Sequence, residues 1–198
     1  MDMINVKING VEYSVPAGST VLEAARYAGI DIPTLCYLKD VNEIGACRLC
    51  LVEVTGARGM VAACVYPTND GMEIFTNTDK VKTARKMNIE LVLSAHNKKC
   101  LSCIRSTNCE LQRYAQEFGV DENYFGGKQP DRSIDESTAF LVRDNSKCIL
   151  CRRCVGACQN MQGIGAIGAA NRGFDTAIEC AFDKKLVDTS CVSCGQCI

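Results

Sequence analysis

Residues 147–158 have the sequence KCILCRRCVGAC, in which cysteines occupy positions 148, 151, 154 and 158. Gaps of two, two and three residues form the run that binds 4Fe–4S clusters in bacterial proteins. In proteins with two such clusters, the fourth cysteine serves the other cluster. We therefore predict that Cys148, Cys151 and Cys154 hold one 4Fe–4S cluster, whereas Cys158 ligates a second. A zinc site would not explain why three evenly spaced cysteines are followed by an offset fourth.

The spacing of this cysteine run recurs at the end of the sequence, in a C-terminal triplet made of Cys191, Cys194 and Cys197. With Cys158 the triplet completes a second predicted 4Fe–4S site. The crossing ligand of the first cluster is expected four residues beyond the triplet, past Ile198. We favour the explanation that the sequence is a fragment truncated inside this motif, which leaves the Cys148 cluster without its fourth ligand and Cys180 as a spare, buried thiol. The alternative is that Cys180 supplies that ligand.

An N-terminal set consists of Cys36, Cys47, Cys50 and Cys64, separated by ten, two and thirteen residues. Four thiolates suit a 2Fe–2S cluster, with two on each iron, and the close central pair can hold one iron. The first gap is longer than the four residues of plant-type ferredoxins. Zinc stays a competing explanation for this set, because four cysteines also bind zinc tetrahedrally.

A histidine set consists of His96, Cys100, Cys103 and Cys109. Three thiolates and one imidazole suit iron or zinc. A neutral imidazole makes the site less negative than a fourth thiolate, which should raise a cluster's potential. A lone histidine is more often structural or exposed. His96, however, is the only histidine in the chain and precedes a cysteine pair by four residues, so we predict that it is a ligand.

Composition supports metal-dependent folding. The chain has 198 residues and 15 cysteines, but aromatic residues make up only 6% and tryptophan is absent, so its apolar core is thin. The net charge of −1 favours neither nucleic acid nor an anionic membrane. No signal peptide or membrane span is recognisable. So many cysteines without an export signal predict a reducing compartment, and thus a cytoplasmic protein whose thiols bind metal.

The apolar pattern predicts an α+β fold. Two strands flank Asn9-Gly10, a strong hairpin signal, and a helix begins at the capping-box pair Thr20 and Glu23 and ends at Gly29. Further strands are expected at 51–54, 60–65, 72–77 and 140–142, and helices at 79–95 and 109–118. These elements define a β-grasp domain (1–78), a small helical domain (79–118), a linker with a short strand (119–145) and a two-cluster domain (146–198).

No acid–base pair, nucleophile or phosphate-binding loop is evident. Gly163, Gly165 and Gly168 match the dinucleotide fingerprint G-x-G-x-x-G. That motif needs a preceding strand and a following helix in a βαβ unit, for which there is little room here. We interpret the glycines as a turn that passes close to a cluster. The sequence thus predicts electron transfer and no catalytic residues.

The order of the cluster motifs resembles a modular arrangement shared, in whole or in part, by iron-only (FeFe) hydrogenases, NAD-linked formate dehydrogenases and the large iron–sulfur subunit of respiratory complex I. KCLSCIRSTNCELQ (99–112) and KCILCRRCVGACQNMQGIGAIGAANRGFDT (147–176), followed by CVSCGQCI (191–198), look like the hydrogenases. The two 4Fe–4S runs argue against the complex I subunit. The likeness covers essentially the whole chain.

This resemblance implies a β-grasp 2Fe–2S ferredoxin-like domain holding the N-terminal set and a helical domain in which the histidine set holds a 4Fe–4S cluster. It further implies a bacterial-type two-cluster ferredoxin-like domain, for a total of one 2Fe–2S and three 4Fe–4S clusters. Such an arm of a hydrogenase catalytic subunit feeds a downstream hydrogen-activating cluster absent from this sequence. The implied partners are flavin/NAD-binding and ferredoxin-like iron–sulfur subunits, together with soluble ferredoxin.

We therefore expect no hydrogen turnover from these 198 residues alone. Two alternatives stay open. The first is the equivalent arm of an NAD-linked formate dehydrogenase, whose downstream domain carries molybdenum or tungsten, or of a complex I-like subunit. The second is a zinc-stabilised structural protein, which explains the N-terminal set well and the cysteine run poorly.

Overall fold

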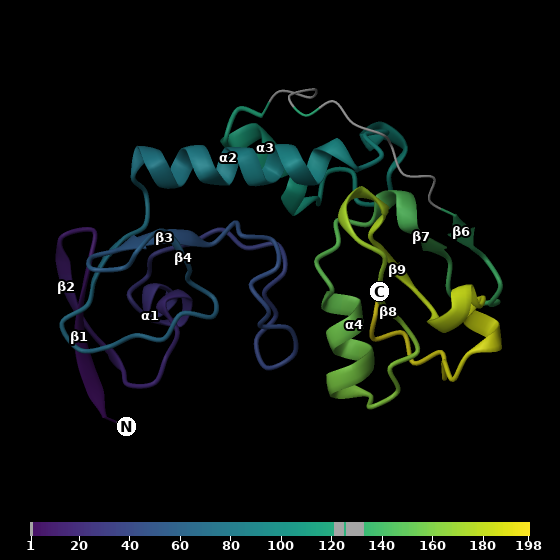
Figure 1. Cartoon of the computed structure of the whole chain (residues 1–198), viewed down its shortest axis with the longest axis horizontal. Coiled ribbons are helices and arrows are strands. Elements are labelled where there is room, and N and C mark those ends of the chain that lie inside the picture. Colours follow the sequence, from purple (N-terminus) through teal and green to yellow (C-terminus); the bar gives the residue numbers. More distant parts are fainter. Residues whose placement is uncertain (1, 121–124, 126–132) are drawn as a thin grey trace. The chain divides into compact units, whose positions relative to one another are not determined.

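The computed structural model describes residues 2–120, 125 and 133–198 (Figure 1). They form two compact units, each built from separate stretches of chain. The first contains Met1–Tyr37, Glu43–Ile89 and Glu110–Val120, and the second contains Leu38–Asn42, Glu90–Cys109 and Asp121–Ile198. The division into consecutive domains expected from the sequence stays a prediction.

The first unit is built on a five-stranded mixed sheet with the order β2-β1-β5-β3-β4. Its strands are β1 (Met3–Ile8), β2 (Val11–Pro16), β3 (Leu51–Val54), β4 (Val61–Ala62) and β5 (Glu73–Phe75). Strands β1 and β5 run parallel, and the other pairs are antiparallel. Asn9 and Gly10 both have positive φ, at 52° and 88°, which confirms the predicted hairpin turn. The fold is α+β, as the sequence predicts.

Helix α1 (Val21–Tyr27) packs on this sheet and carries the predicted capping box, in which Glu23 N–H donates to Thr20 Oγ1 and Thr20 N–H to the Glu23 carboxylate. Its buried residues join a core with strand residues such as Val6 and Val52. Burying this apolar area is the main force that holds the unit together. Cys50 and Cys64 belong to the same core, so this fold fixes the backbone that carries them.

Two further helices occur where the sequence predicts them. Helix α2 (Asp79–Ser94) buries Val81, Arg85 and Ile89, which lie four residues apart on one face. The Arg85 guanidinium donates to the Leu51 carbonyl at 2.9 Å, which ties the helix to β3. Helix α3 (Glu110–Glu117) buries Leu111 and Tyr114. Both agree with the helices predicted at 79–95 and 109–118 to within one residue.

The second unit consists mainly of short elements. They are the strand pairs β6 (Ile134–Asp135) with β7 (Arg143–Asp144) and β8 (Gly168–Ala170) with β9 (Ala177–Glu179), the helix α4 (Arg153–Gly156), which continues into a π-helix (Ala157–Met161), and the 3₁₀ turns Cys100–Ser102, Asn145–Lys147, Gly173–Asp175, Ala181–Asp183 and Leu186–Asp188. A small apolar core packs against four cysteines of the run and the triplet. Its buried members are Leu141, Ile167, Ile178, Cys180 and Leu186, and the four cysteines are Cys148, Cys154, Cys158 and Cys191. Cysteine side chains therefore make up a large share of this small core.

One prediction for this unit needs correction. The strand expected at 140–142 lies instead at β7, because Phe140 and Val142 are exposed and only Arg143 and Asp144 pair with β6. The glycine motif runs from the π-helix into β8, which is the reverse of the strand-to-helix order that a dinucleotide site requires. The structure thus agrees with the sequence analysis, which rejected a dinucleotide site here. Residues 121–124 and 126–132 of the linker predicted at 119–145 lie outside the described residues.

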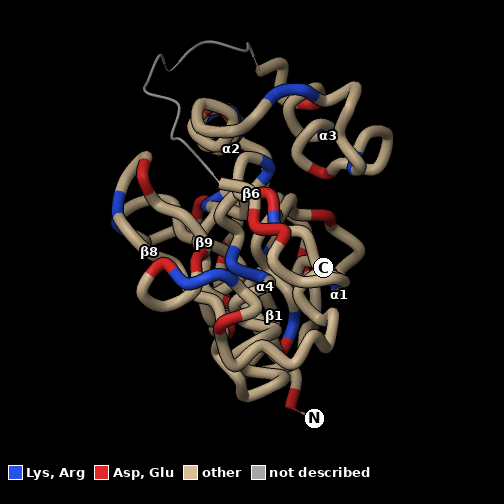
Figure 2. Tube along the Cα trace, turned by 90° about the vertical axis from the view of Figure 1, so that its right-hand side faces the viewer, with Lys and Arg blue, Asp and Glu red and all other residues tan. Residues whose placement is uncertain are grey.

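Acidic and basic residues are interspersed along the trace (Figure 2). Among the described residues, no helix combines the length and the apolar character that crossing a membrane requires.

Residues 38–42 pack closely on α4 within the second unit. Asn42 Nδ2 donates to the Cys151 carbonyl at 3.0 Å, and Asn160 Nδ2 donates to the Val41 carbonyl at 2.9 Å. A Cβ atom at Gly156 would lie only 2.7 Å from the Val41 carbonyl oxygen. Glycine is therefore needed at position 156 for the two backbones to approach each other.

We expect Gly156→Ala to lower the free energy of unfolding by about 1–3 kcal/mol, the usual cost of overpacking, because a backbone carbonyl must move. Denaturant unfolding measures the effect. Gly168→Ala is the matched control, since a Cβ there meets no atom within 4 Å and φ is not positive. Equal stability of the two variants would contradict the predicted close approach.

Candidate metal centres

The fold brings the four cysteines of the N-terminal set together in the first unit. Cys50 directly precedes β3 and Cys64 follows β4, and the Ala63 N–H donates to the Cys50 carbonyl at 3.1 Å. Cys36 and Cys47 come from the loop between α1 and β3, where the Cys47 N–H lies 3.5 Å from Cys36 Sγ. Three of the four thiols are buried and Cys47 is half-buried.

The thiols of this set contact one another. Hydrogen bonds from Cys47 and Cys64 lower the pKa of Cys36 to about 2, and a hydrogen bond from Cys64 lowers the pKa of Cys50 to about 7. Conversely, the pKa values of Cys47 and Cys64 are raised, chiefly by the same hydrogen bonds. Four mutually contacting thiols in an apolar core cannot all ionise unless cations offset their charge, so the donor set fits an iron–sulfur group.

The histidine set lies in the second unit, around the turn between α2 and α3. His96 follows the end of α2, Cys100 begins a 3₁₀ turn, and Cys109 directly precedes α3. Asn97 anchors this turn, because its N–H donates to the Ser146 carbonyl at 3.0 Å and its Oδ1 accepts from the Lys99 N–H at 3.1 Å. The anchor holds the His96 end of the turn beside the start of the cysteine run.

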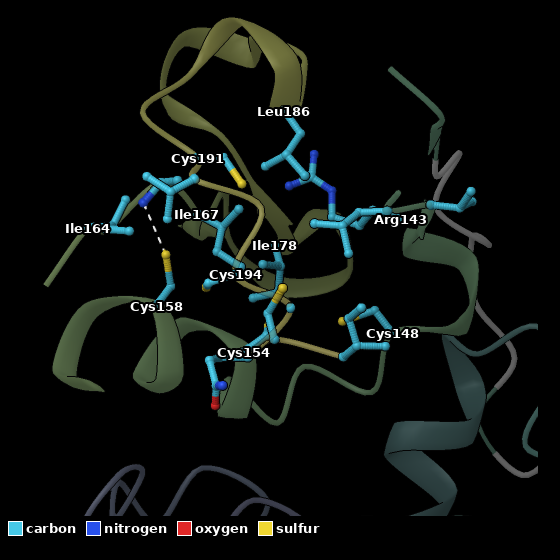
Figure 3. A pocket seen from close by; sticks show the side chains of 18 of the residues that line it. Arg143, Cys148, Cys154, Cys158, Ile164, Ile167, Ile178, Leu186, Cys191 and Cys194 are labelled. Carbon is cyan, nitrogen blue, oxygen red and sulfur yellow. Dashed lines mark hydrogen bonds between the residues drawn. The ribbon is translucent and has the colours of Figure 1, made fainter. Parts of the chain in front are cut away.

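A cavity of about 250 Å³ in the second unit collects cysteines of the run and the triplet (Figure 3). Its walls include Cys148, Cys154, Cys158, Cys191, Cys194 and Cys197. The remaining wall is largely apolar, with Leu141, Ile164 and Ile178 among its residues. A volume many times the roughly 30 Å³ of a water molecule, lined by six thiols, fits a large sulfur-ligated group.

Backbone N–H groups in this cavity point at sulfur. The Leu150 N–H donates to Cys148 Sγ at 3.3 Å, and the Ser193 N–H donates to Cys191 Sγ at 3.5 Å. Leu150 and Ser193 have positive φ, 56° and 53°, a conformation that costs free energy in a residue other than glycine. The same strained turn thus begins both the cysteine run and the C-terminal triplet. Such N–H donors stabilise a thiolate and help set a cluster's potential.

The glycine motif wraps around Cys158. The Ile164 and Gly165 N–H groups donate to the Cys158 carbonyl at 3.0 and 3.3 Å, and the Ala166 N–H donates to Cys158 Sγ at 3.3 Å. Gly163 and Gly165 take positive φ, which allows the chain to curl back on the cysteine. The thiol of Cys158 is thereby aimed into the cavity.

Burial, together with charge on Cys151 and Cys148, raises the pKa of the Cys154 thiol to about 11. Thiolates gathered in this way need nearby cations. Within the part of the chain that the structure describes, no three His, Cys, Asp or Glu side chains form a single-ion site. A cluster distributes its ligands over several iron atoms, whereas zinc draws them to one point. Six thiols spread around one cavity suit a cluster in this respect.

Cys180 lies apart from these groups. Its side chain is only 4% exposed, it lines two other cavities rather than the cysteine cavity, and it accepts a hydrogen bond from Arg143 Nη1 at 3.5 Å. The spacing of cysteines did not predict the Arg143 contact or the N–H donors of Leu150 and Ser193. The direction of these N–H groups depends on the backbone conformation at Leu150 and Ser193, which the residue types at these positions do not indicate.

Comparison with known proteins adds independent information. Residues 1–79 match the family described as 2Fe-2S iron-sulfur cluster binding domain. Residues 85–123 match the family described as NADH-ubiquinone oxidoreductase-G iron-sulfur binding region. The first match includes the whole N-terminal set, and the second includes the whole histidine set.

Two curated relatives align along most or all of the chain. The NADP-reducing hydrogenase subunit HndD of Solidesulfovibrio fructosivorans is 42% identical over 100% of this chain and 35% of its own length. The NADH-ubiquinone oxidoreductase 75 kDa subunit of Reclinomonas americana is 36% identical over 92% of this chain and 26% of its own length. The chain thus spans about a third or less of these relatives.

A solved structure of NAD+-reducing [NiFe]-hydrogenase in the H2-reduced state contains a chain with the same fold. It superposes with a TM-score of 0.86 at 31% identity, over 94% of this chain and 79% of that chain.

Proposed function

Since the chain belongs to the family of iron–sulfur proteins that includes the NADH-ubiquinone oxidoreductase-G iron–sulfur region and its counterpart in NAD-reducing hydrogenase, we propose that it conducts electrons in an NAD(P)-linked oxidoreductase. The observation that carries this proposal is the cysteine cavity, in which six thiols gather and backbone N–H groups donate to three of their sulfur atoms. Each bound cluster supplies a site for one electron. The chain's own residues hold, bury and orient these sites.

We assign the ligands as follows. The N-terminal set binds a 2Fe–2S cluster, and the histidine set binds a 4Fe–4S cluster. Cys148, Cys151 and Cys154 contribute to a second 4Fe–4S cluster, and Cys158 joins the C-terminal triplet in a third. The contacts among the N-terminal thiols and the strained turns at Leu150 and Ser193 support these assignments. Cys180 is not a ligand in this scheme.

For the parent enzyme we propose an iron-only (FeFe) hydrogenase, in which the chain links flavin/NAD-binding or ferredoxin partners, soluble ferredoxin included, to a hydrogen-activating cluster. The motifs at 99–112 and 147–176 support this choice, and the 42% identity to a NADP-reducing hydrogenase subunit supports a hydrogenase as the parent enzyme. A reducing compartment such as the cytoplasm suits its thiols. We expect the isolated 198 residues to show no hydrogen turnover.

A second candidate is the corresponding arm of a [NiFe] enzyme, favoured by the structural likeness that covers 79% of a NAD+-reducing [NiFe]-hydrogenase chain. Nickel analysis of the natural assembly separates the two. Nickel in stoichiometric amount supports the second candidate, and iron without nickel supports the first.

Iron, zinc and acid-labile sulfide per chain, measured on anaerobically prepared protein, test the proposed function. About 14 iron atoms correspond to one 2Fe–2S and three 4Fe–4S clusters. About 10 iron atoms correspond to loss of the Cys148 cluster. Zinc without sulfide would refute electron transfer and support a zinc-stabilised structural protein.

We expect the clusters to be low-potential carriers, with the 2Fe–2S centre near the value of about −400 mV typical of plant-type ferredoxins. That range suits exchange with nicotinamide and ferredoxin partners. A redox titration followed by electron paramagnetic resonance measures the potentials. Values well above zero for every centre would contradict this expectation.

A further inference from the structure

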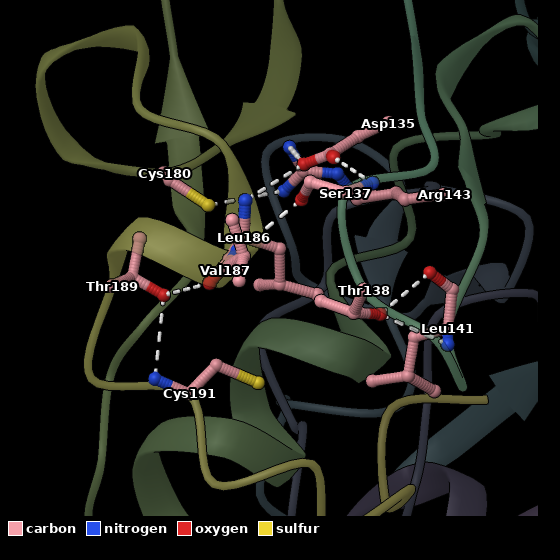
Figure 4. Close-up of polar contacts among 10 residues, drawn as sticks. All are labelled: Asp135, Ser137, Thr138, Leu141, Arg143, Cys180, Leu186, Val187, Thr189 and Cys191. Atoms are coloured by element: carbon pink, nitrogen blue, oxygen red, sulfur yellow. Dashed lines mark hydrogen bonds and ion pairs between the residues drawn. The ribbon is translucent and has the colours of Figure 1, made fainter.

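Arg143 lines the cysteine cavity. It also lines a second cavity, whose lining residues include Cys180 and Lys184. Its side chain is only 21% exposed. Nη2 lies 3.4 Å from Oδ2 of Asp135, whose side chain is 10% exposed, and Nη1 donates to Cys180 Sγ at 3.5 Å. Figure 4 shows the guanidinium between the carboxylate and the thiol. Arg143 therefore places a positive charge, largely shielded from water, beside the candidate ligands.

The contacts offset this charge only in part. Burying an ion is costly unless a counter-ion and hydrogen bonds compensate it. Asp135 is the counter-ion, but Arg143 Nε is buried and has no hydrogen-bond partner among the described residues. Because the surroundings are poorly solvated, the fields of both charges reach further than at the surface. Any group bound in the cysteine cavity is exposed to both fields.

Asp135, which lines the second cavity, has a further structural role. Its Oδ2 accepts the Leu186 N–H at 2.9 Å, and its Oδ1 accepts the Ser137 N–H at 3.0 Å. Interactions with Ser137 and Leu186 and the charge of Arg143 hold the pKa of Asp135 below its usual value, so it is a carboxylate at neutral pH. The pair is thus a fixed positive and a fixed negative charge.

The hydrogen bonds continue from Asp135 to a candidate ligand. Thr189 Oγ1 donates to the Leu186 carbonyl at 2.7 Å and accepts the Cys191 N–H at 3.3 Å. Ser137 Oγ accepts the Val187 N–H at 3.2 Å, which adds a second bond between the β6 segment and this turn. The strand that carries Asp135 therefore holds the turn that leads into the C-terminal triplet (Figure 4).

We propose that Asp135 and Arg143 are an opposed charge pair that sets the reduction potential of the clusters in the cysteine cavity, and that Asp135 also positions Cys191. This inference rests on the proposed function. Reduction adds one electron, and so one negative charge, to a cluster. No bond breaks and no proton moves. Arg143 favours the added charge and raises the potential, whereas Asp135 opposes it and lowers the potential.

The test is a redox titration of the anaerobically prepared full chain, with dithionite as reductant and electron paramagnetic resonance as readout. We expect Arg143→Gln to lower the potential of at least one cluster assigned to the cavity. We expect Asp135→Asn to raise it. Each shift should reach a tenfold change in the reduction equilibrium, about 59 mV for one electron. The double variant should return toward the native value.

Matched controls remove the same charges elsewhere in the second unit. Arg172 and Asp175 are both exposed and line neither cavity, so Arg172→Gln and Asp175→Asn should leave the potentials near native values. If the pair had only a structural role, the two single variants would not shift the potential in opposite directions, and the double variant would not return toward the native potential. Shifts of the same sign, or shifts no larger than in the controls, would overturn the proposal.

Two further measurements keep the result decisive. If Arg143→Gln does not fold, Arg143→Lys retains the charge and should hold the potential near the native value, so a large fall there would count against the charge effect. Iron and sulfide are measured on the native chain first. Their absence defeats the proposed function itself, whereas their presence with unmoved potentials in the variants defeats only this inference.

Discussion

Replacing Cys158 with serine is expected to remove about 4 iron and about 4 sulfide per chain, because this thiol is assigned to the 4Fe–4S cluster of the C-terminal triplet. The structure aims Cys158 Sγ into the cysteine cavity through the Ala166 N–H, which donates to it at 3.3 Å. Serine keeps the size of the side chain but is a poor ligand for iron. Iron and sulfide analysis after anaerobic reconstitution measures the loss.

Cys180→Ser is the matched control. Cys180 is buried, but it faces Arg143 and does not line the cysteine cavity, so the iron content of Cys180→Ser should equal that of the native chain. The opposite pattern, with iron lost from Cys180→Ser and retained in Cys158→Ser, would make Cys180 the ligand and reverse our assignment.

Replacing His96 with cysteine is expected to keep the cluster of the histidine set and to lower its potential by on the order of 100 mV. A thiolate in place of a neutral imidazole adds one negative charge to the site, which disfavours a further electron. A redox titration compares the variant with the native chain, and unchanged iron content shows that the cluster is retained.

Ser102→Cys controls for an added thiol in the same turn. Ser102 is exposed and its side chain donates to the nearby Lys99 carbonyl, so this variant should leave the potential unchanged. If His96→Cys has the native potential while keeping its iron, then His96 does not ligate the cluster. If it loses the iron, the turn cannot present a fourth thiolate at position 96.

Local signals made much of the fold predictable. Asn9-Gly10 specifies a turn with positive φ at both residues, and Thr20 with Glu23 specifies a helix start, because each signal acts within four residues. The spacing of the cysteine run predicted its gathering with the C-terminal triplet for a different reason. A cluster requires cysteines at particular spacings along the chain, and ordinary loops do not. The requirement is therefore visible in the sequence.

The parts that sequence did not predict depend on long-range contacts. Nothing in residues 38–42 indicates that Asn42 donates to the Cys151 carbonyl, 109 residues away. The β6–β7 pair was missed because it joins only two residues in each strand, and the exposed apolar residues Phe140 and Val142 drew the prediction to the wrong place. The positive φ of Leu150 was also unpredictable, since leucine disfavours that conformation.

The interleaving of the two units has a consequence for the order in which the protein can form during synthesis. At roughly 5–20 residues per second, Cys151 leaves the ribosome roughly 5–20 seconds after Asn42, its partner in the second unit. The first unit likewise waits for α3, whose Leu111 and Tyr114 it buries. Neither unit can therefore be completed while its early half stands alone. The cysteines of the N-terminal and histidine sets are therefore synthesised before all the residues that complete their units are available.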